Sequence, residues 1–187
     1  MIKPPYTVFW GEMSAFEHFV QIYEKETVFL DTLADFIGDG LKKGEGTIAI
    51  LTRAHRAELE SRLSVMGISL NIAQSSDQLI LLDAEETLSE FMINDWPDEQ
   101  AFTKVVIGTV NRAAKGGRKV RAFGEMVALM WAQGQCGATV MLERMWSDLC
   151  KRESLPLFCA YPKAGFTEHP SDSINRVCFM HSNVLGG

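Results

Sequence analysis

The chain has 187 residues, of which 47% are hydrophobic and 22% are charged. This apolar content is sufficient for one domain with its own core, so the composition excludes an intrinsically disordered protein. The formal net charge of −6, from 18 basic and 24 acidic residues, argues against a nucleic-acid-binding module, whose binding surface is normally basic. We therefore expect a globular domain without direct nucleic-acid contact.

Cysteine use and hydropathy indicate where the domain works. The four cysteines stand at positions 136, 150, 159 and 178, and no two of them form a Cys-x-x-Cys pair. This pattern is typical of free, reduced thiols in a cytosolic protein. The sequence has no apolar run of ~18 residues and its first residues lack the plan of a signal peptide, so we predict a cytoplasmic protein that does not enter a membrane.

The predicted elements alternate between strands and helices. Residues 28–43 carry apolar side chains at helical spacing, whereas residues 47–52 form a continuous β-branched run that is typical of a strand buried on both faces. The elements expected in chain order are a strand over 19–23, a helix over 28–43, a strand over 47–52, a helix over 54–65, a strand over 79–83, helices over 84–92 and 98–115, a strand over 120–126, helices over 126–133 and 138–152, a strand over 155–162 and a helix over 173–185.

This order predicts an α/β fold with three layers, in which helices cover both faces of a mostly parallel sheet. Thr52 follows a strand and precedes a helix, where its side chain can cap the helix, and Asp83 ends a strand that leads into another helix. Residues 1–17 are predicted to be an irregular lead-in, and residues 18–187 to form a single domain.

The first strand, the loop after it and the first helix have the layout of a nucleotide-binding P-loop unit. The loop is Glu24-Lys25-Glu26-Thr27 and contains no glycine. A P-loop holds phosphates with glycine backbone amides, a lysine and a hydroxyl group, and the two glutamates here would repel a phosphate. We therefore predict a degenerate P-loop that does not hydrolyse nucleotides.

Ligands of open parallel sheets bind beyond the carboxyl ends of the strands, and three polar residues stand at such ends. These are Tyr23, Glu125 and Tyr161. Glu125 follows Gly124, which leaves room for a ligand or another backbone. A carboxylate there needs a partner if it is buried, with Arg121, Arg144, His18 and His181 as candidates. Glu125 is then either part of a structural ion pair or a ligand contact.

Two histidines are further candidates for the site. His18 and Tyr23 are five residues apart, so they point to opposite faces of a regular strand. His181 is predicted to share a helical face with Ile174, Val177, Cys178 and Leu185, either as a core residue or as a ligand contact. His18, Glu125 and His181 would suit iron or zinc, but no short spacing links them, so we predict no metal site and no catalytic residue.

A group of methionines also has two interpretations. Met126 and Met130, like Met141 and Met145, repeat at four-residue spacing. They either pack in the core or form an adaptable lining for an apolar ligand or a partner helix.

Several blocks of the sequence together resemble a known sensory family. The blocks HFVQIYE, GLKKGEG, RAFGEMVALMW, LFCAYP and VCFMHSNVL, from about His18 to Leu185, are similar to the MEDS domain, the methanogen/methylotroph sensory domain named after the regulator DcmR. The segment FLDTLADFIGDGLKKGEGTIAILT also resembles the first helix and second strand of RecA/KaiC-type ATPases. The resemblance implies a KaiC-like three-layer domain that has lost its nucleotide site and serves as a signalling input module.

Members of this family are often joined to histidine kinases or DNA-binding segments and are thought to sense small hydrocarbon derivatives. This chain shows neither addition, so its output is expected to reach a separate histidine kinase or transcriptional regulator. We expect a small, partly apolar molecule to bind through Tyr23, Glu125 and Tyr161, with His18 and His181 as further contacts and without a cofactor. Association between copies of the chain stays open. The alternatives are a ligand-free protein–protein interaction module and, third, a metal-dependent enzyme.

Overall fold

The computed structural model describes residues 17–167 and 169–185, so the predicted lead-in lies outside the described residues except for Glu17. The elements are β1 (His18–Tyr23), α1 (Glu26–Lys42), β2 (Gly46–Leu51), α2 (Arg53–Val65), α3 (Leu70–Ser75), β3 (Leu79–Asp83), α4 (Ala84–Ser89), β4 (Met92–Ile93), β5 (Trp96–Pro97), α5 (Glu99–Ala113), the 3₁₀ turn η2 (Lys115–Gly117), β6 (Val120–Gly124), α6 (Met126–Ala132), α7 (Cys136–Glu153), β7 (Leu157–Pro162), η3 (Lys163–Gly165), α8 (Pro170–Phe179) and β8 (Asn183–Leu185).

Six strands form one sheet in the order β3-β2-β6-β7-β1-β8. Every pairing in this sheet is parallel, which confirms the predicted parallel architecture. The predicted cap at Thr52 is confirmed, because its side chain accepts a hydrogen bond from the backbone of His55. Asp83 also caps a helix, since its side chain accepts bonds from the backbones of Glu85 and Glu86, which was not predicted. Each cap satisfies backbone N–H groups in the first turn of the helix that follows the strand.

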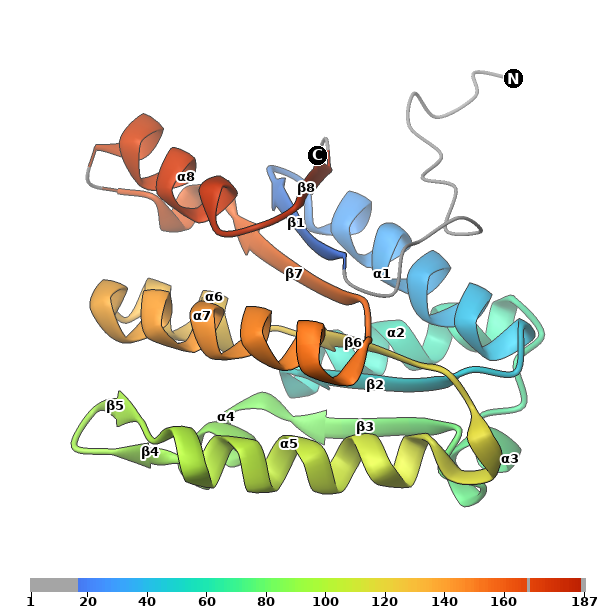
Figure 1. Ribbon diagram of the computed structural model, residues 1–187. Helices are drawn as coiled ribbons and strands as arrows, with labels where there is room; N and C mark the ends of the chain where they lie inside the picture. The colour runs from blue at the N-terminus through green and yellow to red at the C-terminus, as the bar shows by residue number, and fades with distance from the viewer. Residues whose placement is uncertain (1–16, 168, 186–187) are drawn as a thin grey trace, which may run out of the picture.

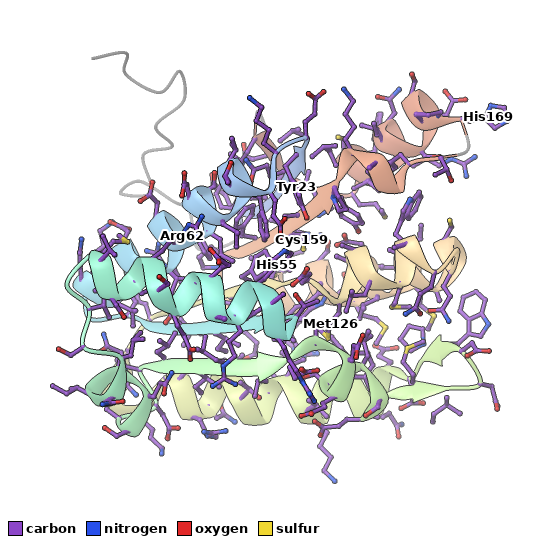
Figure 2. The ribbon with its side chains drawn as sticks, turned by 180° about the vertical axis from the view of Figure 1, so that it is seen from behind. Tyr23, His55, Arg62, Met126, Cys159 and His169 are labelled. Carbon is purple, nitrogen blue, oxygen red and sulfur yellow. The ribbon has the colours of Figure 1, made fainter. Side chains whose placement is uncertain are left out.

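Helices cover both faces of the sheet, as predicted. Figure 1 shows α5 and α7 running across one face, and Figure 2, from behind, shows α2 across the other. The core is correspondingly divided by the sheet: Phe123 packs with the apolar residues of α1 and α2, whereas its neighbour Ala122 packs with those of α5, α6 and α7. Successive residues of a strand point to opposite faces, so the buried strands supply both cores.

The helix predicted over residues 173–185 is wrong in its second half. Helix α8 ends at Phe179, and Asn183–Leu185 form β8, which pairs in parallel with β1. Without β8, one edge of β1 would have unpaired backbone N–H and C=O groups, and this short segment pairs with them. A local pattern of apolar residues does not predict such a pairing with a distant strand.

Several small elements were not predicted. They include helix α3 and the hairpin of β4 and β5. The hairpin turns through Asn94 and Asp95, which have φ angles of 50° and 64°. Residue types that tolerate positive φ at both central positions are the usual signal for such a turn.

The methionines divide between the two interpretations. Met126, Met130 and Met145 are buried in the core, which confirms core packing for these three, whereas Met141 is exposed. Among the described residues, no helix combines the length and the apolar character needed to cross a membrane.

Candidate functional site

The predicted site residues lie on two opposite faces of the sheet. Tyr23 packs with the core under α1 and α2, whereas Tyr161 belongs to the core on the α7 side. His18 and His181 lie on that second side, against Glu143 of α7. His18 and Tyr23 therefore point to opposite faces of β1, as predicted. The structure brings together His18, Tyr161 and His181, and separately Tyr23 and Glu125.

Glu125 is held at the carboxyl edge of the sheet by internal contacts. Its Oε2 accepts a hydrogen bond of 2.8 Å from the backbone of Thr52, and its Oε1 lies 2.7 Å from Nδ1 of His55. The other ring nitrogen of His55, Nε2, lies 2.7 Å from Oε1 of Glu26. We call Glu26, His55 and Glu125 the edge network; it joins the start of α1, the start of α2 and the end of β6.

The partners that the sequence analysis named for Glu125 are wrong. Arg121 donates to the carbonyl oxygen of Phe36 over 2.9 Å and pairs with Asp39 and Glu45. Arg144 is exposed, and the two predicted histidines lie on the other face of the sheet. The sequence analysis did not identify His55 as the partner of Glu125, because His55 lies in a different element, α2. The cap at Thr52 fixes the start of this helix, which lies beside the end of β6.

The edge network explains the acidic loop after β1. Glu26 stands in the first turn of α1, where the positive end of the helix dipole favours a negative charge. His55 contacts this carboxylate through Nε2, and Glu24 forms an exposed ion pair of 2.6 Å with Lys163. Both glutamates of the loop therefore have partners within the chain.

Hydrogen bonding and charge alter the pKa values around the edge network. The hydrogen bond to Glu125 raises the pKa of His55, and this outweighs the opposing effect of burial. Burial, then the charges of Glu125 and Glu26, raise the pKa of Tyr23 well above its usual value. Tyr23 stacks on Phe29 with ring centroids 4.7 Å apart, and Phe29 meets the edge of His55 at 5.2 Å. Figure 2 labels both Tyr23 and His55.

The raised pKa of His55 predicts a pH-dependent stability. Protonated His55 stabilises the fold fully below its unfolded pKa of about 6.5, and this contribution disappears as the pH rises through the higher folded-state pKa. We expect the difference in unfolding free energy between the wild type and His55→Gln to shrink as the pH rises above about 6.5. Urea unfolding of both proteins below and above that pH measures the difference. A difference that stays constant or grows with pH would contradict the assignment.

A second group of polar side chains lies buried between α7 and the sheet. His18, Glu143, Cys159, Tyr161 and His181, here called the buried cluster, come from β1, α7, β7 and the segment between α8 and β8. Nε2 of His18 lies 3.4 Å from Oε2 of Glu143 and 3.3 Å from Sγ of Cys159. Nε2 of His181 also lies 3.4 Å from Oε2 of Glu143, and Tyr161 donates to the other carboxylate oxygen. Histidine, carboxylate and thiol groups that converge in this way are potential metal ligands.

Neighbouring strands bring the two histidines together. Ser182 donates to the carbonyl oxygen of His18 through both its backbone and its hydroxyl group, at 2.9 and 3.0 Å. This contact continues the pairing of β8 with β1 and places His181 against His18, with ring centroids 4.1 Å apart. Cys159 and Tyr161 are two residues apart on β7 and so face the same side.

Glu143 was missed by the sequence analysis although the sequence contains a signal for it. The buried stripe of α7 includes Thr139, Leu142, Trp146 and Leu149 at helical spacing, and Glu143 lies within this stripe. A glutamate on the buried face of a helix is rarely found without a partner. The partners, however, lie on other elements, so the stripe alone did not identify them.

The buried environment strongly affects ionisation in the cluster. Burial alone would raise the pKa of Glu143, but the facing His181 and His18 bring it below the usual value. Burial lowers the pKa of His18 to about 3, so this ring is neutral. Burial lowers the pKa of His181 as well, but the carboxylate of Glu143 more than reverses this effect and raises it. Burial also raises the pKa of the Cys159 thiol and of the Tyr161 hydroxyl.

A cavity of about 720 Å³ opens beyond the carboxyl ends of β6 and β7. The buried rings of Trp131 and Phe166 form its floor, and Asp172 and Arg176 of α8 stand at its rim. Its lining consists of Trp131, Ala132, Gly134, Cys136, Ala164, Gly165, Phe166, Thr167, His169, Asp172, Ser173 and Arg176. Figure 2 shows His169 at this outer end of the molecule, away from His55. We call this space the α6–α8 cavity.

Comparison with protein-family models identifies a match to this chain. The family model described as the methanogen/methylotroph, DcmR sensory domain (MEDS) matches residues 17–182. No curated protein matches the sequence. The match covers β1 through the turn after α8 and includes every residue of the edge network and of the buried cluster. The chain belongs to the MEDS family of sensory domains.

Proposed function

We propose that the chain is a cytoplasmic signalling input domain that binds a small, partly apolar molecule in the α6–α8 cavity. Membership of a sensory-domain family supports the signalling role. The volume of about 720 Å³ supports the binding role, because pockets for small molecules commonly enclose about 300–1,000 Å³. The aromatic floor suits an apolar group, and the charged rim suits a polar one.

The observation that carries the proposal is that Tyr161 connects the cavity to the buried cluster. The ring of Tyr161 contacts the floor, with centroids 6.4 Å from Trp131 and 5.9 Å from Phe166. Its hydroxyl group donates to Glu143 inside the cluster. A molecule that displaces either floor ring would therefore act on the contacts of Glu143.

Helix α8 forms a second connection between the cavity and the buried cluster. It carries the rim residues Asp172 and Arg176, and the chain reaches His181 two residues after its end. A ligand with different affinities for two positions of α8 would shift the balance between them. The altered surface would then change the contact with a separate partner, such as a histidine kinase or a transcriptional regulator.

The edge network supports a role without nucleotide hydrolysis or other catalysis. The carboxylate of Glu125 contacts the backbone N–H of Thr52 and the ring of His55, and the carboxylate of Glu26 contacts the other ring nitrogen of His55. We assign Tyr23 and Glu125 to the stability of this edge. Tyr161, His18 and His181 lie behind the floor of the cavity and respond to the ligand.

Saturation-transfer NMR with dichloromethane, methanol and propan-1-ol as probes tests the proposal, together with native mass spectrometry for a co-purified molecule. We expect at least one probe to bind, and Trp131→Ala to weaken that binding about tenfold, since a lost aromatic contact costs about 1.4 kcal/mol. Trp96→Ala is the matched control because Trp96 is exposed and lies outside the cavity lining.

Two outcomes would count against this function. Equal binding by the wild type and Trp131→Ala would place the site elsewhere. Bare protein in native mass spectrometry and no saturation transfer from any probe would favour the ligand-free interaction module instead.

A further inference from the structure

Four potential ligand atoms of the buried cluster converge on one point. They are Nε2 of His18, Oε2 of Glu143, Sγ of Cys159 and Nε2 of His181, and all lie within 4.8 Å of one another. A tetrahedral zinc ion, with bonds of about 2.0–2.1 Å to nitrogen and oxygen and about 2.3 Å to sulfur, holds its ligand atoms about 3.3–3.6 Å apart. Four of the separations are 3.3, 3.4, 3.4 and 3.9 Å. Three of these separations match those of a tetrahedral zinc site, and the fourth, between Cys159 and Glu143, is slightly longer.

The outer nitrogens of both histidines are fixed by hydrogen bonds. Nδ1 of His181 lies 2.7 Å from the carbonyl oxygen of Val177, which only accepts, so this nitrogen carries a hydrogen. Nδ1 of His18 lies 3.0 Å from the hydroxyl group of Ser147. Metal-binding histidines are held by the same arrangement, in which the outer nitrogen contacts a carbonyl or hydroxyl group and Nε2 faces the ion.

The inner nitrogen of His181 lacks a hydrogen bond. Among the described residues, Nε2 of His181 is one of the few buried side-chain nitrogens without such a partner, although the side chain is 0% exposed. It lies 3.4 Å from Oε2 of Glu143 without the geometry of a hydrogen bond. A buried polar atom of this kind is costly unless a ligand occupies the space that it faces.

We propose that His18, Glu143, Cys159 and His181 bind one zinc ion. Two imidazoles, a thiolate and a carboxylate form a nitrogen and sulfur rich set that favours zinc in tetrahedral geometry. On binding, Cys159 loses its thiol proton and His181 loses any proton on Nε2. The thiolate of Cys159 and the carboxylate of Glu143 then balance the two positive charges of Zn²⁺, so the buried site has no net charge.

Four protein ligands leave no open coordination position, which is typical of a structural rather than a catalytic zinc site. The ion would join β1, α7 and β7 to the segment that follows α8. It would thereby fix the end of α8, whose other residues form the rim of the α6–α8 cavity. The zinc proposal does not depend on whether that cavity binds a ligand.

The test uses the full chain with its purification tag removed. Elemental analysis of protein from zinc-supplemented cells should find about one zinc ion per chain. Protein stripped with a chelator and titrated with Co²⁺ should develop the visible bands of tetrahedral cobalt and a thiolate-to-cobalt charge-transfer band. Cys159→Ser should lose the charge-transfer band, and His181→Gln should lose the tetrahedral spectrum.

The matched control is Cys150→Ser, because Cys150 is also a buried cysteine on this side of the sheet but is not one of the four ligands. It should keep both spectral features. Ser147→Ala removes the partner of His18 Nδ1 and should weaken Zn²⁺ affinity about 10–100-fold, as other losses of such outer contacts do. Circular dichroism verifies that each variant is folded.

The proposal fails if the folded wild type takes up less than roughly a tenth of an equivalent of Zn²⁺ and of Co²⁺, where a closed site would take about one. It also fails if Cys159→Ser and His181→Gln bind the metal as tightly as the wild type does. If a ligand variant does not fold, the wild-type stoichiometry, the cobalt spectrum and Ser147→Ala still decide the outcome.

Discussion

Replacing Glu143 with leucine should lower the free energy of unfolding by about 3–5 kcal/mol, because removing one member of a buried charged group leaves the others without a partner. The residues that lose their partner are His181, His18 and Tyr161. Glu143 is 0% exposed, so water cannot replace the lost carboxylate. Urea unfolding of chelator-treated protein measures the effect without a contribution from bound metal.

Two control variants show whether the buried position causes this loss. Glu153→Leu makes the same change near the end of α7, where the side chain is partly exposed, and should alter stability by less than about 0.5 kcal/mol. Glu143→Gln retains an oxygen that can accept from Tyr161 and should cost less than the leucine variant. A Glu143→Leu protein within about 1 kcal/mol of the wild type would show that the cluster contributes little to stability.

Glu125→Ala is expected to cost about 3 kcal/mol, since each hydrogen bond to a charged group contributes about 1.5–3 kcal/mol. The substitution removes the acceptor of the Thr52 backbone and the partner of His55 Nδ1. The start of α2 should loosen first, and amide hydrogen exchange of Thr52 and His55 should accelerate. Urea unfolding together with hydrogen exchange measures both effects.

Further variants separate a structural role of Glu125 from ligand contact. Glu26→Gln changes a carboxylate whose side chain is 62% exposed and should cost less than about 1 kcal/mol. Glu125→Gln retains an acceptor for Thr52, so it should be less destabilising than alanine and should leave probe binding in the α6–α8 cavity unchanged. Loss of probe binding in Glu125→Gln would restore Glu125 as a ligand contact and contradict the cavity as the binding site.

Local patterns predicted the main elements and the parallel three-layer fold. The apolar runs of β2 and β7 and the cap at Thr52 depend on neighbouring residues only, so the sequence contains the information directly. Strand β8 was predicted as helix because its conformation depends on the free edge of β1, more than 160 residues earlier in the chain. Pairing at the edge of a sheet depends on the tertiary structure, and the spacing of apolar residues along the chain does not predict it.

The sequence by itself determined the family, the strand ends that carry Tyr23, Glu125 and Tyr161, and the opposite directions of His18 and Tyr23 on β1. Only the tertiary structure decided which of these residues meet. The strand order places β7 and β8 on either side of β1, and α7 then presents Glu143 to His18, Cys159 and His181. These contacts join residues from three separate elements and from the segment between α8 and β8, and their distances follow from sheet order and helix packing. Spacing along the chain contains no such distances, and therefore the buried cluster could not be read from the sequence.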